Sequence, residues 1–510
     1  MTKKECRIIP EETSSATVKR KHIYFEEFHC NRQTKRQKLV SSETKTKTKT
    51  LTLNPEPVRN PPGWNRFHAI RPCSSSSSRV HKRWQKRNNF RSSEASRNWV
   101  FSSYDCSDCK DKVVIVSYNI LGVENAAKHP DLYLNVPRKF LKWDRRKDLI
   151  CKEVNHYNAD ILCFQEVDRF KDLDDLLHEN GFKGVYKVRT GDACDGCALF
   201  WTEKNLLSPH LLNKHLERCR KQLYMLMAFV YIELALPKFT LLHEDNIEFQ
   251  DFDLRNNVAQ FCVLKMNRHQ SESSSHAKPS KKRQMRSRRL LVGNIHVLFN
   301  PNRGDIKLGQ VRLFLEKAYK LSQEWGNIPV ILVGDFNSIP QSAMYQFLAS
   351  SELNIQLHDR RQISGQLEHS SQRRKIRAQN KDIDRHHVWT PFSRQLTSSW
   401  SDEELVLATG NKGVTHLQHK LNLSSAYLGA PGSHGTRDSH GEPSATSYHS
   451  KFMGTVDYIW HTGELIPVKV LDTLPVDVLR RNASLPSERW GSDHLALVCE
   501  LAFADDCKEP

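Results

Sequence analysis

The stretch Val-Ile-Leu-Val-Gly-Asp-Phe-Asn at residues 330–337 is a short apolar run that ends in a glycine, a carboxylate and an amide. Four consecutive aliphatic residues bounded by a glycine predict a β-strand that is buried on both faces. Apolar runs at 113–116 and 160–164 lead in the same way to Asn119 and Glu166. The sequence therefore predicts buried strands that present polar side chains at their ends.

The same pattern continues along the chain and alternates with helical patterns. Further strand-like runs lie at 197–201, 257–264, 290–297, 455–460 and 495–501. Helical periodicity covers 143–157 and 307–325. Strands punctuated by helices indicate an α/β body.

The charge of the chain is concentrated at its beginning. The 510 residues carry a net charge of +19, and 38% of them are hydrophobic. Residues 1–110 have 24 Lys and Arg against 10 Asp and Glu, a net of +14, whereas the remaining 400 residues carry only +5. We therefore expect a basic, low-complexity and disordered tail over 1–110, followed by a nearly neutral folded body over 111–503.

Several protein classes are excluded by composition. No apolar run reaches the roughly 18 to 20 residues that a membrane helix needs, so no membrane partner is expected. Thirteen cysteines are too few for a disulfide scaffold, and no secretory leader is recognisable, so a reducing compartment is favoured. Two Cys-x-x-Cys pairs, Cys106/Cys109 and Cys194/Cys197, lie 85 residues apart, far from the spacing of a zinc ribbon. Spare or buried thiols are the favoured interpretation.

The basic tail contains sequence patterns that indicate nuclear import and RNA binding. Basic clusters at 19–21 and 35–38 have the spacing of a bipartite nuclear import signal. Aromatic residues between 64 and 99 are interleaved with Arg and Lys, a mixture that suits RNA binding through phosphate neutralisation and stacking. The alternative to RNA binding is that this part of the tail is a solvated, disordered arm. We expect the protein in the nucleus and the cytoplasm.

The polar residues at the strand ends form a chemically coherent set. They are Asn119, Glu166, His296, Asp335, Asn337, Asp457, Asp493 and His494. Any one of them could serve only a turn, but loops at strand ends are where a rigid sheet presents catalytic groups. Oxygen ligands without thiolates favour Mg²⁺, with Mn²⁺ as an option, over zinc. Such a site suits hydrolysis of a phosphodiester.

A set of short motifs makes the resemblance to a known family specific. In order, they are Ser-Tyr-Asn-Ile-Leu at 117–121, Phe-Gln-Glu-Val-Asp at 164–168, Asp-Gly-Cys-Ala-Leu-Phe-Trp at 195–201, Gly-Asp-Phe-Asn at 334–337, Val-Asp-Tyr-Ile at 456–459 and Ser-Asp-His at 492–494. The set resembles the endonuclease/exonuclease/phosphatase superfamily, and within it the carbon-catabolite-repressor-type deadenylases. The stretch 294–310 is similar to the Angel branch, and the plant homologs without leucine-rich repeats are also similar.

The resemblance, which covers about 111–503, implies a fold and a metal site. The fold is an α/β, four-layered sandwich of two stacked mixed sheets flanked by helices. Glu166 would be the principal ligand of Mg²⁺, helped by Asn119 and, near a second metal position, by Asp493.

The resemblance also implies catalytic roles. Asp335 would orient or deprotonate the attacking water, and Asn337 would hold the scissile phosphate. His494, oriented by Asp457, would stabilise the developing charge, while His296 would contact the phosphate.

Four further residues are candidates for substrate binding. Phe452 and Pro301 match positions that sandwich the terminal adenine in the deadenylases. Lys187 and Arg189 precede the Asp-Gly-Cys motif and are candidates for binding phosphate oxygens; an exposed strand edge is the alternative.

The chain departs from the family in two places. No leucine repeat precedes the body, so docking to the large deadenylase complex through such repeats is not expected. A polar excursion at 355–450 separates two motifs that are usually close, so that 119 residues lie between Asn337 and Asp457. A basic insertion at 265–289 has nine Lys and Arg and one Glu, which would add salt-sensitive affinity for RNA.

Two enzymatic hypotheses and one alternative remain open. The first is a Mg²⁺-dependent 3′-to-5′ exoribonuclease that shortens the poly(A) tails of mRNA. The second is an RNA 2′,3′-cyclic phosphatase of the Angel type, because both reactions attack a phosphoester. The third, a non-catalytic RNA-binding scaffold, is disfavoured because no expected catalytic residue is missing.

Overall fold

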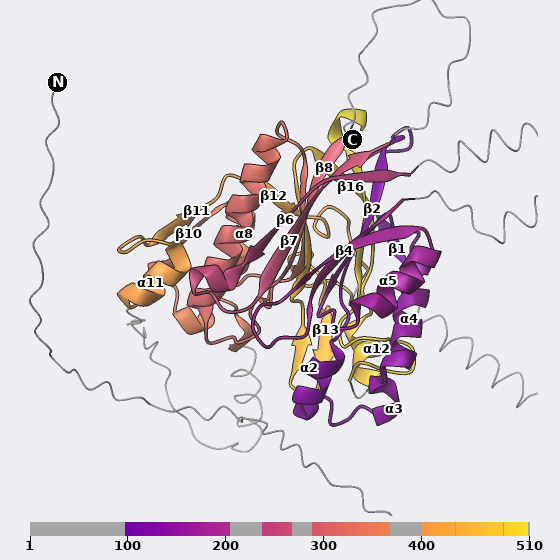
Figure 1. The fold of residues 1–510 in the computed structure, drawn as a ribbon, viewed down its shortest axis with the longest axis horizontal. Helices are drawn as coiled ribbons and strands as arrows, with labels where there is room; N and C mark the ends of the chain where they lie inside the picture. Colours follow the sequence, from indigo (N-terminus) through magenta and orange to yellow (C-terminus); the bar gives the residue numbers. More distant parts are fainter. Residues whose placement is uncertain are drawn as a thin grey trace, which may run out of the picture. The chain divides into compact units, whose positions relative to one another are not determined.

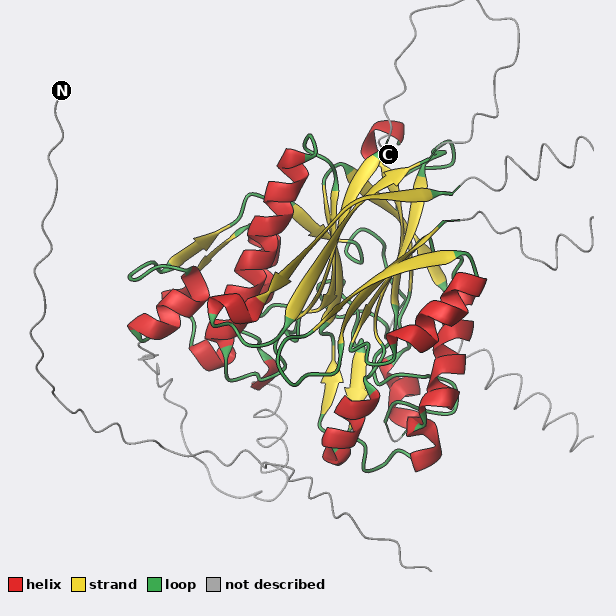
Figure 2. Ribbon diagram, viewed as in Figure 1, coloured by secondary structure: helices red, strands yellow, loops and turns green. Residues whose placement is uncertain are grey.

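The computed structural model describes residues 97–203, 237–267, 288–367, 400–433, 435–482 and 484–507. Within these ranges the chain forms two large β-sheets with helices on their outer faces (Figures 1 and 2). The expected strands and both expected helices are present, with ends shifted by a few residues.

The first sheet has seven strands in the order β1-β16-β17-β2-β3-β5-β4. Their bounds are β1 Trp99–Phe101, β2 Lys112–Asn119, β3 Ile161–Gln165, β4 Phe182–Val188, β5 Gly196–Thr202, β16 Leu465–Leu471 and β17 Leu497–Phe503. Strands β2 and β3 are parallel, whereas the other neighbouring pairs are antiparallel. The sheet is therefore mixed.

The second sheet has six strands in the order β12-β15-β9-β8-β7-β6. Their bounds are β6 Phe239–Glu248, β7 Val258–Met266, β8 Arg289–His296, β9 Val330–Asp335, β12 Leu423–Ser425 and β15 Asp457–Thr462. Here β8 and β9 are the parallel pair. Two small hairpins complete the strands: β10 Glu352–Asn354 with β11 His416–Gln418, and β13 Ser447–His449 with β14 Phe452–Gly454.

The helices lie outside the two sheets. The α-helices are α2 Val123–Lys128, α3 Arg138–Leu141, α4 Trp143–His156, α5 Phe170–Glu179, α8 Gly304–Glu324, α9 Ala343–Ser350, α11 Asp402–Thr409 and α12 Val476–Arg481. Short 3-10 turns are η1 Pro130–Leu132, η2 Phe249–Phe252, η3 Ile355–Leu357, η4 Arg360–Gln362 and η5 Ala504–Asp506.

Three buried clusters account for the layers. Apolar residues of both sheets meet in a central cluster that includes Ile115, Leu199, Val292 and Val333. Helices α4 and α5 bury their apolar faces against the outer face of the first sheet, and α8 and α9 against that of the second, with α11 packed on α8. The four-layered α/β sandwich of two mixed sheets is thereby confirmed.

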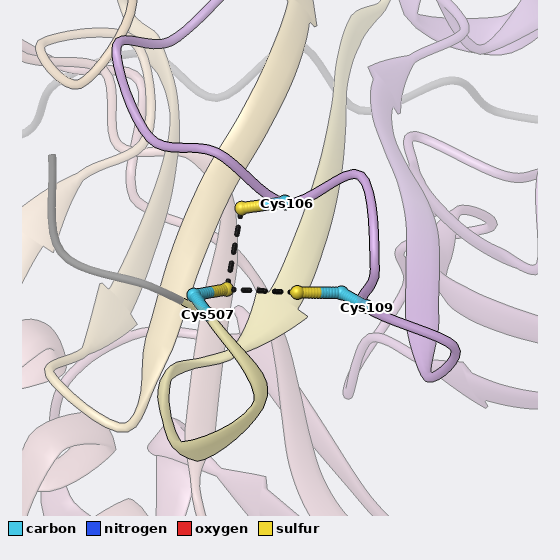
Figure 3. A group of neighbouring side chains, drawn as sticks. All are labelled: Cys106, Cys109 and Cys507. Carbon is cyan, nitrogen blue, oxygen red and sulfur yellow. Dashed lines mark hydrogen bonds between the residues drawn. The ribbon is translucent and has the colours of Figure 1, made fainter.

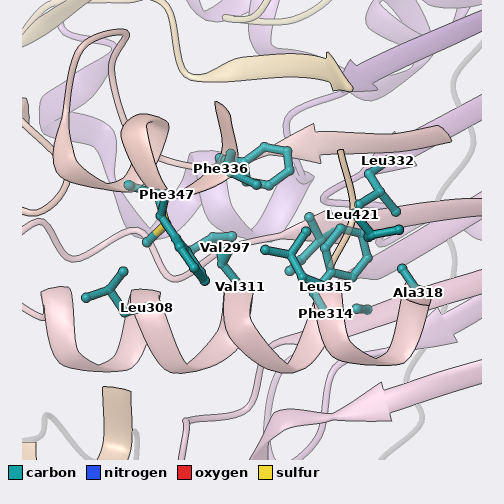
Figure 4. Close-up of a cluster of buried hydrophobic side chains, with 14 of the residues drawn as sticks. Val297, Leu308, Val311, Phe314, Leu315, Ala318, Leu332, Phe336, Phe347 and Leu421 are labelled. Atoms are coloured by element: carbon teal, nitrogen blue, oxygen red, sulfur yellow. The ribbon is translucent and has the colours of Figure 1, made fainter. Parts of the chain in front are cut away.

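Helix α8 has the longest apolar face of the described helices. Figure 4 shows Val311, Phe314 and Leu315 on one side of α8, facing Leu332 and Phe336 of the β9 region. The spacing of three and four residues along α8 places these side chains on one stripe of the helix. Ile331 and Val333 of β9 belong to the central cluster instead, so this strand, which ends in Asp335, is packed on both faces.

The folded part begins earlier than the sequence predicted. Residues 97–110 were assigned to the tail, but β1 pairs with β16, and Arg97 donates 2.6 and 2.8 Å hydrogen bonds to the backbone oxygens of Ala496 and Asp472. The boundary at 110 is therefore wrong by about a dozen residues. A strand of three residues is too short to give a clear periodic signal.

The excursion at 355–450 is also more ordered than its polar composition suggested. Its described part supplies helix α11, whose Ser401 and Glu404 form a reciprocal capping box, and strand β12, which pairs with β15 in the second sheet. The Ser-x-x-Glu pattern at 401–404 was a readable sign of a helix start. Much of this segment is therefore part of the body.

Other expectations fall outside the described residues. They are the basic clusters, the aromatic residues at 64–90 and most of the insertion at 265–289. Among the helices that the structure describes, none combines the length and apolar character needed to cross a bilayer.

Replacing Phe314 by alanine tests the packing of α8. Phe314 is fully buried, so Phe314→Ala should leave a cavity and lower the free energy of unfolding by about 3 to 5 kcal/mol. Leu134→Ala is the control, because Leu134 is 75% exposed. Denaturant titration would measure both; equal losses for the two variants would contradict this packing.

Candidate active site

Polar side chains from both sheets surround one cleft. The cleft has a volume of about 500 Å³. Among the residues that line it are Glu166, His296, Asp335, Asn337, Asp493 and His494. The two sheets are stacked so that β2, β3, β8 and β9 all present their carboxyl ends to this cleft, as expected for a site at strand ends.

Glu166 is held as an ionised carboxylate just after β3. Its Oε1 accepts a hydrogen bond from Asn119 Nδ2 at 3.0 Å, and its Oε2 accepts from Gly122 N at 3.0 Å and Asn125 Nδ2 at 2.9 Å. Burial alone would raise its pKa, but the positive charge of His296 and these donors outweigh burial and lower the pKa to about 2. Glu166 also adopts a left-handed φ of 58°, which is rare for a non-glycine residue and common at functional sites.

Asn119 links the two sheets. Besides Glu166, its Nδ2 donates to Asp335 Oδ2 at 3.1 Å, and its Oδ1 accepts from Leu121 N at 3.0 Å. Asn119 thus orients two carboxylates, which gives it a positioning role in this arrangement.

A steric constraint explains why the Gly-Asp-Phe-Asn motif begins with a glycine. Gly334 has a φ of 148°, and a Cβ placed there would lie 1.9 Å from the carbonyl oxygen of Ile295 on β8. Only glycine allows β8 and β9 to approach this closely at their ends. This close approach brings His296 Nε2 to 3.6 Å from Asp335 Oδ2.

His494 and Asp457 form a buried pair. The Nδ1 of His494 lies 2.8 Å from Asp457 Oδ2, while its Nε2 lies 3.9 Å from Asp335 Oδ2. Asp457 begins β15, whereas His494 precedes β17, so the pair connects the two sheets.

The charges in this group shift two pKa values in ways that suit catalysis. Burial opposes a charged imidazole, but the charge and hydrogen bond of Asp457, together with two further carboxylates, outweigh it and raise the pKa of His494 well above its ordinary value. Burial, then the charge of Asp457, raises the pKa of Asp335, against the opposing effect of the two histidines. A cationic imidazole therefore faces a carboxylate of increased basicity.

Asn337 and His296 both line the cleft. Asn337 has a left-handed φ of 46°, and its Nδ2 donates one hydrogen bond to Val297 O at 3.0 Å; within the described residues its second N–H is left to bind an anion. His296 Nδ1 is buried and has no protein partner in the described part of the chain. The amide of Asn337 and the exposed part of the His296 ring could therefore contact phosphoryl oxygens.

Asp493 lines the same cleft. Its Oδ2 accepts a 2.9 Å hydrogen bond from the hydroxyl of Tyr133, a residue that the sequence gave no reason to select.

Three of the four predicted substrate-binding residues line the cleft. They are Phe452, at the start of β14, Pro301 and Arg189. Arg189 NH2 donates to Asn256 Oδ1 at 2.6 Å. Lys187 is not brought to the cleft; its ammonium pairs with Glu248 instead. The ion pair joins β4, the edge strand of the first sheet, to β6, the edge strand of the second, so Lys187 is best described as an edge residue.

Several supporting residues were not predicted. Lys307 is fully buried in α8 and donates from Nζ to Asn337 O at 2.6 Å, while burial lowers its pKa to about 7. Gln310 and Asn257 hold the end of β8, since Gln310 Nε2 donates to Asn257 Oδ1 at 3.1 Å and Asn257 Nδ2 donates to His296 O at 3.0 Å. Lys307 and Gln310 lie within the 294–310 stretch, and two polar residues on an otherwise apolar helix face were the available signal.

The donor set fits a divalent metal ion. Asp335, Asp457 and His494 each offer one ligand atom within 4.8 Å of the others. However, Asp457 and His494 are hydrogen-bonded to each other, so Glu166, which is ionised and lines the cleft, is the better anchor for an ion. Carboxylate oxygens are the ligands that hard cations prefer.

The site lies at the ends of two stacked mixed sheets and combines carboxylates, amides and a histidine that is hydrogen-bonded to a carboxylate. This combination is typical of a phosphoester hydrolase. Residues 116–494 match the Endonuclease/Exonuclease/phosphatase family, and the chain belongs to this family.

Relatives from plants and animals agree with this assignment. The chain is 56% identical over 421 residues to Carbon catabolite repressor protein 4 homolog 5 of Arabidopsis thaliana, which covers 81% of this chain and 82% of that protein. It is 30% identical over 434 residues to Protein angel homolog 2 of Homo sapiens, and the match covers 78% of this chain and 70% of that protein.

A solved structure also matches. The crystal structure of ANGEL2, a 2′,3′-cyclic phosphatase, in complex with adenosine-2′,3′-vanadate is similar with a TM-score of 0.56 and 27% identity, covering 80% of this chain and 99% of that one. The carbon-catabolite-repressor-like and Angel branch predicted from the motifs is thereby confirmed.

Asp457→Asn tests the electrostatic role of the His494 pair. A raised pKa keeps the imidazole protonated to higher pH, and activity that needs the cation falls as the pH rises through that pKa. Removing the Asp457 charge should therefore move the alkaline limb of kcat/KM to lower pH and reduce the rate by about 10²- to 10⁴-fold. Hydrolysis of bis(p-nitrophenyl) phosphate across pH would measure it.

The matched control is Asp144→Asn, because the Asp144 side chain is 97% exposed on α4. An alkaline limb that stays in place in Asp457→Asn would disprove the role of this pair.

Proposed function

We propose that this protein is a Mg²⁺-dependent 3′-to-5′ exoribonuclease that shortens the poly(A) tails of mRNA. The observation that carries the proposal is the position of Phe452 and Pro301 in the same cleft as the Asp335–His494 group. A cleft of about 500 Å³ has the size of a small-ligand pocket, which suits the end of an RNA strand better than the middle of a duplex. Attack near a terminal nucleotide is what an exonuclease requires.

Mg²⁺, or Mn²⁺ in its place, would be held by Glu166. The low pKa of Glu166 keeps this carboxylate ionised at neutral pH, so no proton competes with the ion. The bound ion would act as a Lewis acid on the phosphoryl oxygens. Asp493 would bind near a second metal position, and Asn119 would orient Glu166.

The protein's own residues would perform the remaining steps. Asp335, whose pKa is raised, would orient the attacking water and take its proton. The free N–H of Asn337 and the imidazole of His296 would hold the scissile phosphate, with Arg189 at the edge of the cleft. Protonated His494 would stabilise the charge that develops on phosphorus-bound oxygen.

The substrate would be RNA, and the base would be recognised by stacking. Phe452 offers a ring and Pro301 a flat apolar surface on which an adenine can stack. The basic tail and the insertion at 265–289 would add affinity through phosphate contacts. We further propose that the protein acts in the nucleus and the cytoplasm, without docking through leucine-rich repeats.

A second candidate function is removal of a 2′,3′-cyclic phosphate from an RNA end. The observation that favours it is the match to ANGEL2, whose structure contains adenosine-2′,3′-vanadate. The same cleft, water-activating carboxylate and phosphate-binding donors would serve this reaction, because it also opens a phosphodiester.

Two RNA substrates separate the candidates and test the metal. One RNA ends in about twenty adenosines with a free 3′-hydroxyl, and the other ends in a 2′,3′-cyclic phosphate. With Mg²⁺ we expect the first to shorten from its 3′ end and to slow at the first nucleotide that is not A. Conversion of the second RNA alone would favour the cyclic phosphatase. Glu166→Gln should lower either rate by at least about a hundredfold, because it removes the ionised ligand; an unchanged rate would contradict the metal assignment.

Phe452→Ala tests the stacking role. Loss of about 1 to 3 kcal/mol of stacking should raise KM for A-ended RNA by roughly 5- to 150-fold and reduce the preference for A over C. Phe101→Ala is the control, since Phe101 is 63% exposed on the edge strand β1. Unaltered base preference in Phe452→Ala would rule out this contact.

A further inference from the structure

Three cysteine thiols from the two ends of the catalytic domain meet at one point. Cys106 and Cys109 lie in the loop between β1 and β2, and Cys507 follows η5 after β17. The sulfur of Cys507 lies 3.2 Å from that of Cys106 and 3.2 Å from that of Cys109, and all three sulfurs lie within 4.8 Å of one another. Figure 3 shows the three side chains pointing toward a common centre.

The backbone holds this arrangement independently of the sulfurs. Cys109 N donates to Cys106 O at 3.2 Å, which closes a turn that places both sulfurs on the same side. On the other chain segment, Cys507 N donates to Ala504 O at 3.2 Å. Cys106 and Cys109 are both buried, so the thiols are not scattered surface groups.

An arginine ties the two segments together beside the thiols. Arg288 pairs with Asp505 at 2.6 Å and with Asp506 at 2.7 Å, and its Nε lies 3.5 Å from Asp111, in the segment that follows Cys109. The cysteine loop and the end of the domain are thus fixed relative to each other by groups that are not cysteines. A site that is positioned in advance in this way loses little entropy when it binds an ion.

We propose that Cys106, Cys109 and Cys507 form a binding site for Zn²⁺. Thiolates at Cys-x-x-Cys spacing, joined by a third from a distant segment, are the ligands that zinc prefers in structural sites. With Zn–S bonds of about 2.3 Å, tetrahedral geometry places neighbouring sulfurs about 3.8 Å apart, so the thiols need to separate by only about half an ångström. Each thiol releases its proton on binding, and water completes the fourth position.

The geometry favours an ion over a disulfide. A disulfide needs its sulfurs at about 2.05 Å and uses two thiols, so one of the three would always remain unpaired. An iron–sulfur cluster is usually held by four cysteines. The second Cys-x-x-Cys pair takes no part, because Cys197 lies in β5 with its sulfur near Val258 O.

The site is remote from the catalytic cleft and would serve the fold. Strand β2 runs from Lys112 beside the cysteine loop to Asn119 in the cleft, a distance of about 23 Å at 3.3 Å per residue. Strand β17 connects the same two places, with His494 before it and Cys507 after it. An ion here would clamp segments 401 residues apart in sequence, which restricts the unfolded chain strongly.

The experiment uses the full chain, loaded with Zn²⁺ or Co²⁺ under reducing conditions. Elemental analysis should find one tightly bound zinc per chain. Cobalt should give a near-ultraviolet thiolate-to-metal band together with the visible bands of tetrahedral coordination. No cysteine is among the described residues that line the catalytic cleft, so an ion bound there would not produce that charge-transfer band.

Variants assign the ion to the three cysteines. Cys507→Ser should weaken cobalt binding by about a hundredfold or more and remove the thiolate band. Cys194→Ser, in the other Cys-x-x-Cys pair, should leave both unchanged. A zinc chelator should lower Tm in the unsubstituted protein and in Cys194→Ser, but not in Cys507→Ser.

If Cys507→Ser does not fold, Cys106→Ser and the spectrum of the unsubstituted protein decide the question. Absence of the cobalt–thiolate band in the folded, reduced protein would overturn the proposal. A disulfide between two of these cysteines in the protein as isolated, found by mass spectrometry without reduction, would replace it with a redox link. Copper or iron in place of zinc would also overturn it.

Discussion

The contact on which the site depends is the pair of hydrogen bonds that Asn119 of the first sheet donates, one within its own sheet and one to the second sheet. One amide nitrogen holds Glu166 of the first sheet and Asp335 of the second at 3.0 and 3.1 Å. Beneath it, Gln165 Nε2 donates to Asn294 Oδ1 at 2.8 Å, again from one sheet to the other. Apolar packing between sheets tolerates sliding, whereas buried polar groups must meet their partners. These bonds therefore fix how the two sheets are aligned.

Alignment of the sheets determines the electrostatics of the cleft. His494 is cationic because carboxylates from both sheets surround it, and Asp335 is more basic because it is buried beside Asp457. A shift of one strand by a single residue in its pairing register would turn its side chains to the opposite face of the sheet. Gly334 contributes to this arrangement as well, because the absence of a side chain lets β8 and β9 lie close together at the ends that carry His296 and Asp335. The charges and pKa values in the cleft therefore depend on the register of the strands and on the alignment of the two sheets.

The fold and most site residues could be predicted because both leave local signals. Buried strands appear as aliphatic runs, and the polar residue at each strand end stands out against them, as with Asn119, Glu166 and Asp335. The prediction was weaker for the short strand β1 and for the segment around α11, where few residues carry the pattern. The strand-edge alternative for Lys187 could not be chosen from the sequence, because its ion pair with Glu248 joins strands of two different sheets. Lys307, Tyr133 and Asn125 were missed because their partners lie in other elements.

The sequence by itself determined the class of fold, the polar residues that end the strands and the family to which the chain belongs. These features depend on residue type and on spacing along the chain. Tertiary structure alone decided which of those residues share a cleft, how their pKa values shift, and that Cys507 joins Cys106 and Cys109 across 401 residues. The physical reason is that charge, hydrogen bonding and metal coordination act through space over a few ångströms, whereas sequence patterns record only neighbours along the chain.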